Sequence, residues 1–181
     1  VFLPCSYGFR RGLGVEDAVQ AVLTHRDRNL RWVFDGDIQN CFEEIDHKRL
    51  LSLLRAKVRH PLLMQYIKTW LAAGLLTGLD GRPRTKGASQ GSVLSPLFAN
   101  IYLHEVDSTL TSHGLAYVRY ADDFVICCRR RTDAESALAL MAKTLRRVGM
   151  ELHPQKTRIT HFDAGVAWLG YFLVRNDSYR L

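Results

Sequence analysis

Apolar residues recur along the chain with two spacings, one helical and one that alternates at every second residue, and together they predict a mixed fold. Helical spacing marks five segments: one after Gly14, one after the N-cap Asp46, one from Pro61 to Gly74, one from Ser95 to Gly114, and one that starts with a Thr132–Glu135 capping box and stops at Gly149. β-Prone runs lie near 31–38, 115–120, 124–129, 157–162 and 166–174. This order predicts an α+β fold in which helices pack on one face of an antiparallel sheet.

Two adjacent carboxylates, Asp122 and Asp123, interrupt the apolar sequence between two of the predicted strands. The interruption is short, so the strands should form a β-hairpin with the acids at its tip, although no Asn-Gly or Asp-Gly pair favours a tight turn. Carboxylates that repel each other beside a sheet are normally offset by a cation, and hard oxygen ligands suit Mg²⁺. A solvated turn is the alternative, since Asp is common in turns, and these residues alone fit both.

A second acidic segment, Asp35-Gly36-Asp37, ends the predicted strand near 31–38. Because side chains alternate along a strand, Asp35 and Asp37 project on the same face, and periodicity does not decide which of them would bind a metal. Carboxylates from two strands are what two-metal phosphoryl transfer requires, where one ion activates the attacking hydroxyl and the other stabilises the leaving oxygens. The two acidic segments together predict nucleotidyl transfer.

Six segments, in family order, resemble the motifs of reverse transcriptases of the group II intron type. They are residues 6–10 (SYGFR), 37–47 (with DI and FEEIDH), 87–96 (GASQGSVLSP), 120–123 (YADD), 152–157 (LHPQKT) and 168–171 (WLGY). The resemblance implies a polymerase palm at 31–165, preceded by part of the fingers at 1–30 and followed by a primer-grip hairpin at 166–181, where the connection to the thumb starts. It also implies a fragment without the upstream fingers and the thumb, with little or no polymerase activity in isolation.

The resemblance also implies catalytic roles for the residues that match the family's motifs. The metal ligands for two Mg²⁺ ions would be Asp37, the Ile38 carbonyl, Asp122 and Asp123. Of these, Asp123 would lie near the primer end. Lys156 matches a lysine proposed to protonate the pyrophosphate leaving group or to neutralise its charge. Asp35 lies at a position where the family has no ligand.

Further matched residues would contact the substrates. Phe42 corresponds to the steric gate, whose ring occupies the space that a ribose 2′-hydroxyl needs. Gln90 and Gly91 would face a nucleotide or the template, and Tyr120 would pack beneath the primer terminus. The primer grip would consist of Leu169, Gly170 and Tyr171. A buried apolar strand explains this last pattern equally well.

Composition is consistent with a nucleic-acid enzyme. The 181 residues are 47% hydrophobic, which is enough to bury the core of one domain, and the formal net charge is +7. A basic chain favours polyanionic partners. The resemblance implies an RNA template, a DNA primer and dNTPs as partners, with intron RNA or CRISPR integrase machinery as further candidates. Because no run of about 18 apolar residues occurs, no membrane partner is predicted, and a cytoplasmic location of the bacterial type is expected.

Three alternatives to a group II intron reverse transcriptase make different demands on these residues. A non-catalytic RNA-binding maturase scaffold would not need intact Asp37, Asp122 and Asp123. A nucleotide cyclase would share the acids but would not be expected to carry the Ser-Gln-Gly segment or Lys156. A CRISPR-associated or antiphage reverse transcriptase of the same lineage is poorly distinguished by palm residues alone.

Overall fold

The computed structural model describes residues 2–73, 85–88 and 93–181. They belong to two compact units, one made of Val1–Gln39 with Val106–Leu181 and the other of Asn40–Glu105. The predicted substrate-binding residues Gln90 and Gly91 lie outside the described residues. The division into partial fingers, palm and primer grip follows sequence motifs, and the two units do not test it.

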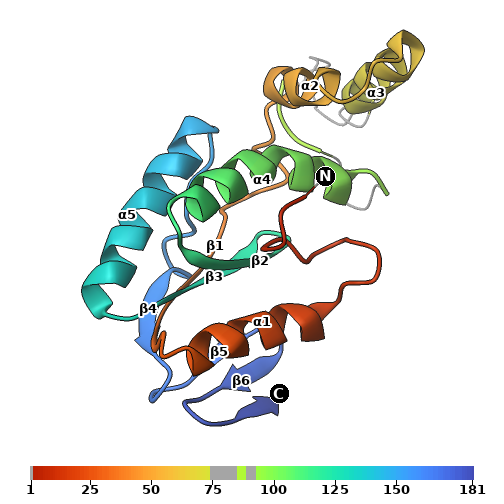
Figure 1. Cartoon of the computed structure of the whole chain (residues 1–181). Helices are drawn as coiled ribbons and strands as arrows, with labels where there is room; N and C mark the ends of the chain where they lie inside the picture. Colours follow the sequence, from red (N-terminus) through yellow and green to blue (C-terminus); the bar gives the residue numbers. More distant parts are fainter. Residues whose placement is uncertain (1, 74–84, 89–92) are drawn as a thin grey trace. The chain divides into compact units, whose positions relative to one another are not determined.

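A four-stranded antiparallel sheet organises the first unit (Figure 1). Its strands lie in the order β2 (Ala116–Tyr120), β3 (Asp123–Cys128), β1 (Trp32–Asp37) and β4 (Arg158–His161). Four of the predicted β-prone runs correspond to these strands, because their β-branched and aromatic residues favour an extended backbone. The predicted α+β class with an antiparallel sheet is therefore confirmed.

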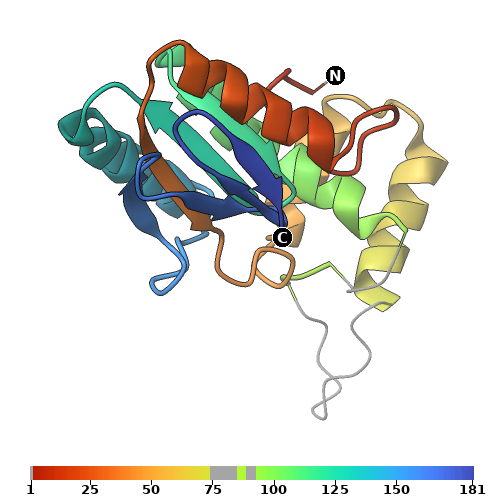
Figure 2. The ribbon, with the colours of Figure 1, turned by 90° about the horizontal axis from the view of Figure 1, so that it is seen from below.

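One face of this sheet is covered by α1 (Val15–Asp27) and by a second, three-stranded sheet (Figure 2). Val33 and Val125 belong to one buried cluster with apolar residues of α1 and with Trp168 and Leu173 of the second sheet. Because alternate residues of a strand share a face, the cluster contains Val125 and Cys127 of β3, which are two positions apart. Burial of its apolar surface is the main term that stabilises the unit.

The second sheet corrects one detail of the predicted strands. Its strands, in spatial order, are β5 (Val166–Trp168), β6 (Tyr171–Leu173) and β7 (Ser178–Arg180). The single strand predicted from the apolar run near 166–174 is therefore wrong, because β5 and β6 form a hairpin there. The resemblance places a hairpin at 166–181, and β7 was not predicted. Leu169 and Gly170 form the β5–β6 turn, with positive φ angles of 48° and 78°. A glycine adopts this conformation without steric cost, so Gly170 was a signal within an otherwise continuous apolar run.

Helix α5 (Arg131–Arg147) packs against β1, β3 and β4, on the side of the sheet opposite α1 (Figure 1). The sequence predicts helices on one face of the sheet, and α1 covers part of the other face as well. The predicted Thr132–Glu135 capping box is wrong. Asp133 Oδ2 accepts a hydrogen bond from Arg130 N at 3.2 Å, while Glu135 pairs with a neighbouring arginine side chain.

The second unit contains α2 (His47–Arg55) and α3 (Pro61–Ala73), and α4 (Ser95–Ser112) begins in it and ends in the first unit. Asp46 caps α2 as predicted, because its Oδ1 accepts a hydrogen bond from Arg49 N at 2.7 Å. Within the described ranges, no helix combines the length and the apolar character that crossing a bilayer would require.

Candidate active site

Strand pairing brings three acidic residues from two distant segments to one end of the four-stranded sheet. Asp37 is the last residue of β1, Asp123 is the first residue of β3, and the two are partners in the antiparallel register. Asp122 precedes Asp123 in the turn between β2 and β3. The predicted hairpin with acids at its tip is therefore present, and the β1–β3 register adds the third acid to it.

The acidic turn consists of Ala121 and Asp122, between the paired residues Tyr120 and Asp123. Ala121 has a φ of 58°, in the left-handed region that few residues other than glycine adopt. Two-residue hairpins use such angles because they match the right-handed twist of the strands. The conformation of Ala121 therefore determines the direction in which Asp122 leaves the sheet.

Lys156 lies at the same end of the sheet. Its Nζ is 2.6 Å from Asp37 Oδ2, and 62% of the lysine side chain is exposed against 10% of the aspartate side chain. Backbone pairing continues beyond β1 and brings this segment close, since His153 N donates to Asp37 O at 2.8 Å. Gln39 N likewise donates to Glu151 O at 3.0 Å. The hydrogen bond with Asp37 raises the pKa of Lys156, so the ammonium is charged at neutral pH.

The carboxylates at this site influence one another's protonation. Burial, followed by the charges of Asp122 and Asp37, raises the pKa of Asp123 to about 6. Burial is also the main cause that raises the pKa of Asp122, and the charge of Asp37 adds to it. The charge of Lys156 acts in the opposite direction on both. Partly desolvated carboxylates that repel in this way favour a nearby cation.

Asp35, which periodicity alone could not separate from Asp37, has a partner of its own. It is buried, and Arg158 Nε lies 3.0 Å from its Oδ2 and 3.2 Å from its Oδ1. The two residues are register partners in β1 and β4. Burial raises the pKa of Asp35, and the charge of Arg158 opposes this effect. Sequence reasoning missed Arg158, because only the β1–β4 register places it opposite Asp35.

Gly36 lies between the two aspartates of β1 and leaves no room for a side chain. A Cβ at this position would lie 2.9 Å from Phe124 Cζ and 3.3 Å from Thr157 Oγ1, and Phe124 is fully buried. We expect Gly36→Ala to lower the free energy of unfolding by about 1–3 kcal/mol, as overpacking does. Chemical denaturation would measure the loss. Combination with Phe124→Leu should recover part of it, and purely additive losses would contradict the clash.

Two other predicted residues lie close to the acids in the chain. Tyr120 ends β2, is half-buried and packs partly against the core cluster. Ile38 is buried and pairs with Leu152 in an isolated antiparallel bridge. The hydrogen bonds that flank this bridge use the Asp37 carbonyl and the Gln39 amide. The Ile38 carbonyl takes no part in these two hydrogen bonds. Its role as a metal ligand stays a prediction.

The remaining predicted residues that the structure describes belong to other elements of the chain. Phe42 is half-buried in the second unit, and its carbonyl accepts a hydrogen bond from Ala88 N at 2.8 Å. Leu169 and Gly170 form the β5–β6 turn, and Tyr171 begins β6. The assignments of Phe42 to the sugar gate and of the hairpin to the primer grip stay predictions.

The chemistry of the acidic residues fits a divalent cation. Their oxygens are the hard donors that Mg²⁺ prefers, and a cation would offset the burial and the carboxylate repulsion that together raise the pKa of Asp123. However, among the residues that the structure describes, no three His, Cys, Asp or Glu side chains are grouped closely enough to hold a metal ion. Asp37 is paired with the Lys156 ammonium instead. The predicted ligand set therefore stays a prediction.

Comparison with known proteins decides the family. The family described as "Reverse transcriptase (RNA-dependent DNA polymerase)" matches residues 1–173. The chain belongs to the reverse transcriptase family. The match includes the strand that ends at Asp37, the acidic hairpin and the Lys156 segment, so the resemblance based on the six motifs is confirmed.

Relatives of this chain include two proteins that are described by their introns. The "Group II intron-encoded protein LtrA" of Lactococcus lactis subsp. cremoris is 27% identical over 94% of this chain and 39% of its own length. "Protein YkfC" of Escherichia coli is 27% identical over 98% of this chain and 57% of its own. The "Uncharacterized 91 kDa protein in cob intron" of Schizosaccharomyces pombe is 27% identical over 89% of this chain and 27% of its own length. The chain thus spans between 27% and 57% of the length of these relatives.

Solved telomerase structures share the fold. Telomerase from Candida albicans, in complex with a TWJ fragment of telomeric RNA, superposes with a TM-score of 0.75 at 14% identity, over 98% of this chain and 34% of that chain. Apo telomerase from Candida tropicalis gives a TM-score of 0.68 at 14% identity, over 97% of this chain and 37% of that chain. At this identity the likeness shows the fold alone, and it agrees with the α+β class.

Proposed function

We propose that the chain forms the polymerase core of an RNA-directed DNA polymerase of the group II intron type. The observation that carries the proposal is the register that sets Asp37 beside Asp123, with Asp122 in the adjoining turn. Carboxylates that converge from two paired strands fit a site for nucleotidyl transfer. Similarity to an intron-encoded protein supports the intron type, and the CRISPR-associated and antiphage enzymes are the alternatives within the lineage.

The residues have distinct tasks in the proposed reaction. Two Mg²⁺ ions would be held by Asp37, Asp122, Asp123 and the Ile38 carbonyl. When bound, they would activate the primer 3′-hydroxyl and stabilise the charge of the leaving oxygens. Lys156 is protonated and largely exposed beside Asp37, so its flexible side chain can turn towards a phosphate. There it would donate a proton to the pyrophosphate or neutralise its charge.

The proposed partners are an RNA template, a DNA primer and dNTPs. The formal net charge of +7 supports nucleic-acid binding, because basic side chains that contact phosphates release counterions. Affinity for an RNA–DNA hybrid should therefore fall steeply as the salt concentration rises.

Primer extension on an RNA template by the full-length protein tests the proposed function. We expect a DNA product that requires the template, dNTPs and a divalent cation, and that chelation abolishes. A folded protein that binds the hybrid but extends no primer with either Mg²⁺ or Mn²⁺ would contradict a polymerase. That result would favour the non-catalytic RNA-binding scaffold.

Sugar selection gives a separate prediction for Phe42. Replacement by Val removes the ring that would fill the space of a 2′-hydroxyl, so ribonucleotide incorporation should rise relative to deoxyribonucleotide incorporation by about tenfold or more. Single-nucleotide extension measures the ratio. Tyr66→Val, a change at an exposed aromatic residue of the same unit, should leave the ratio unchanged. An unchanged ratio in Phe42→Val would contradict the steric gate.

A further inference from the structure

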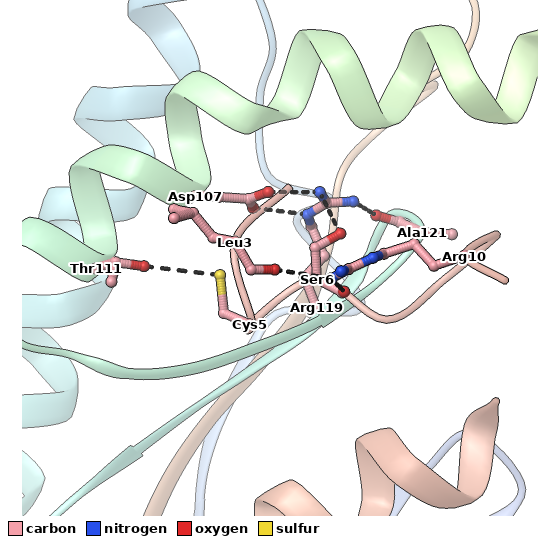
Figure 3. Close-up of polar contacts among 8 residues, drawn as sticks. All are labelled: Leu3, Cys5, Ser6, Arg10, Asp107, Thr111, Arg119 and Ala121. Carbon is pink, nitrogen blue, oxygen red and sulfur yellow. Dashed lines mark hydrogen bonds and ion pairs between the residues drawn. The ribbon is translucent and has the colours of Figure 1, made fainter. Parts of the chain in front are cut away.

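Arg119 carries a positive charge in the interior of the first unit. It lies within β2, and its side chain is 0% exposed. Its guanidinium pairs with Asp107 at two points, with Nε 2.8 Å from Oδ1 and Nη2 2.6 Å from Oδ2 (Figure 3). The Asp107 side chain is also 0% exposed. A two-point pair of this kind fixes the plane of the guanidinium as well as its position.

Two further hydrogen bonds connect Arg119 to the N-terminal segment and to the acidic turn. Nη2 also donates to Ser6 Oγ at 3.0 Å, and Nη1 donates to the carbonyl oxygen of Ala121 at 2.7 Å (Figure 3). Ala121 is the residue with the left-handed φ, immediately before Asp122. The guanidinium therefore links α4, the N-terminal segment and the turn that carries the acids.

The N-terminal segment runs along the outer edge of β2 and also contacts this turn. Arg119 N donates to Cys5 O at 2.7 Å, and Tyr7 N donates to Arg119 O at 2.8 Å. The next residue, Gly8, lies so close that a Cβ there would overlap the amide nitrogen of Ala121. The turn is thus held at its carbonyl by a hydrogen bond and at its amide by backbone contact.

Stability alone does not account for this buried ion pair. Burial and the charge of Asp107 raise the pKa of Tyr117 well above its ordinary value and that of Cys5 to about 11, so both are neutral at neutral pH. Arg119 and Asp107 thus balance each other. Apolar residues of similar volume can often replace such a pair without loss of stability. What they cannot replace is the hydrogen bond that fixes the Ala121 carbonyl.

We propose that Arg119 is a positioning residue for Asp122. Held by Asp107 and Ser6, it fixes the left-handed turn from which Asp122 projects. An arginine suits this role because its planar fork donates in several directions at once, whereas a lysine ammonium is a point charge. The inference rests on the proposed function, since it takes Asp122 to be catalytic.

Three variants separate positioning from folding. Arg119→Met combined with Asp107→Leu removes both charges together, so no unpaired ion is left, and it removes the hydrogen bond to Ala121. Gly8→Ala keeps the ion pair, and its new Cβ would clash with the amide nitrogen of Ala121 in the turn. Arg26→Met is the matched control, because Arg26 is another buried arginine whose guanidinium donates to backbone carbonyls between β6 and β7.

Hydrogen exchange of the backbone amides at 120–123 and the kinetics of primer extension are the two readouts. For the paired variant and for Gly8→Ala, we expect exchange in the turn to be faster by about tenfold or more. The kcat should fall by about 10²-fold, because small displacements of reacting groups have effects of this size, while KM for the primer–template changes by less than about threefold. Arg26→Met should lower the melting temperature and leave exchange in the turn unchanged.

The exchange measurement decides the inference without any need for polymerase activity. If the wild-type protein extends no primer, the proposed function fails, whereas faster exchange in the paired variant still supports the dependence of the turn on Arg119. A folded paired variant whose turn exchanges like wild type overturns the inference, whatever its activity. If the paired variant does not fold, Arg119→Lys decides in the same way, because it keeps the charge and loses the planar fork, and unchanged exchange in the turn of that variant overturns the inference.

Discussion

We expect Asp37→Asn and Asp122→Asn each to reduce DNA synthesis by the full-length protein by at least about 10³-fold, with the fold intact. An asparagine amide keeps the size of the side chain but loses the negative charge that would hold the metal ions at the transferring phosphate. Single-turnover primer extension on an RNA template measures the loss, and thermal denaturation of the same samples confirms that the variants are folded.

Asp35→Asn is the matched control, because Asp35 lies two residues from Asp37 in the same strand and pairs with Arg158. Its replacement removes a charge-assisted hydrogen bond and should lower stability, but it should keep most of the extension rate. Near-normal extension by a folded Asp37→Asn or Asp122→Asn variant would contradict the assignment of the acids. An equally severe loss of rate in Asp35→Asn would contradict the choice between the two aspartates of β1.

The largest expected effect on stability comes from Asp107→Ala. The substitution leaves the Arg119 guanidinium buried without its counter-charge, and both side chains are 0% exposed, so solvent does not screen the loss. We expect the free energy of unfolding to fall by about 3–5 kcal/mol. Equilibrium denaturation at neutral pH would measure the fall.

The exposed pair between Arg131 and Glu135, whose side chains are 65% and 54% exposed, provides the comparison. Glu135→Ala should leave the free energy of unfolding close to the wild-type value, because water already solvates both charges. Adding Arg119→Met to an Asp107→Leu background should restore most of the stability that Asp107→Leu alone removes. A fall in Asp107→Ala no larger than that in Glu135→Ala would show that the buried charge needs no partner.

Local patterns account for the parts of this structure that the sequence predicts well. The four strands of the main sheet follow from short β-prone runs, and the acidic hairpin follows from Asp122 and Asp123 between two of them. The cap of α2 follows from Asp46, since the hydrogen bond that it accepts comes from a residue three positions later. Such features depend on neighbours in the chain, and neighbours are what a single sequence displays.

Features that depend on register or on distant partners were not predictable. Asp35 and Asp37 look equivalent in the sequence, and only the β1–β4 pairing gives one of them Arg158. Arg119 is a charged residue within an apolar strand, which signals a buried pair, but its partner Asp107 lies in a helix and no local pattern points to it. The position of the acids is therefore visible in the sequence, whereas the residues that hold them in place are not.

Whether Asp37, Asp122 and Asp123 form a metal-binding catalytic centre is tested most directly by counting Mn²⁺ ions in a stalled complex. The complex would contain the full-length protein, an RNA template, a DNA primer without a 3′-hydroxyl and the matching dNTP, and electron paramagnetic resonance would report bound Mn²⁺. We expect two bound ions per complex for the wild-type protein and for Asp35→Asn, and fewer for Asp37→Asn and Asp122→Asn. Two bound ions of unchanged affinity in both of the latter variants would contradict a catalytic centre built from these carboxylates.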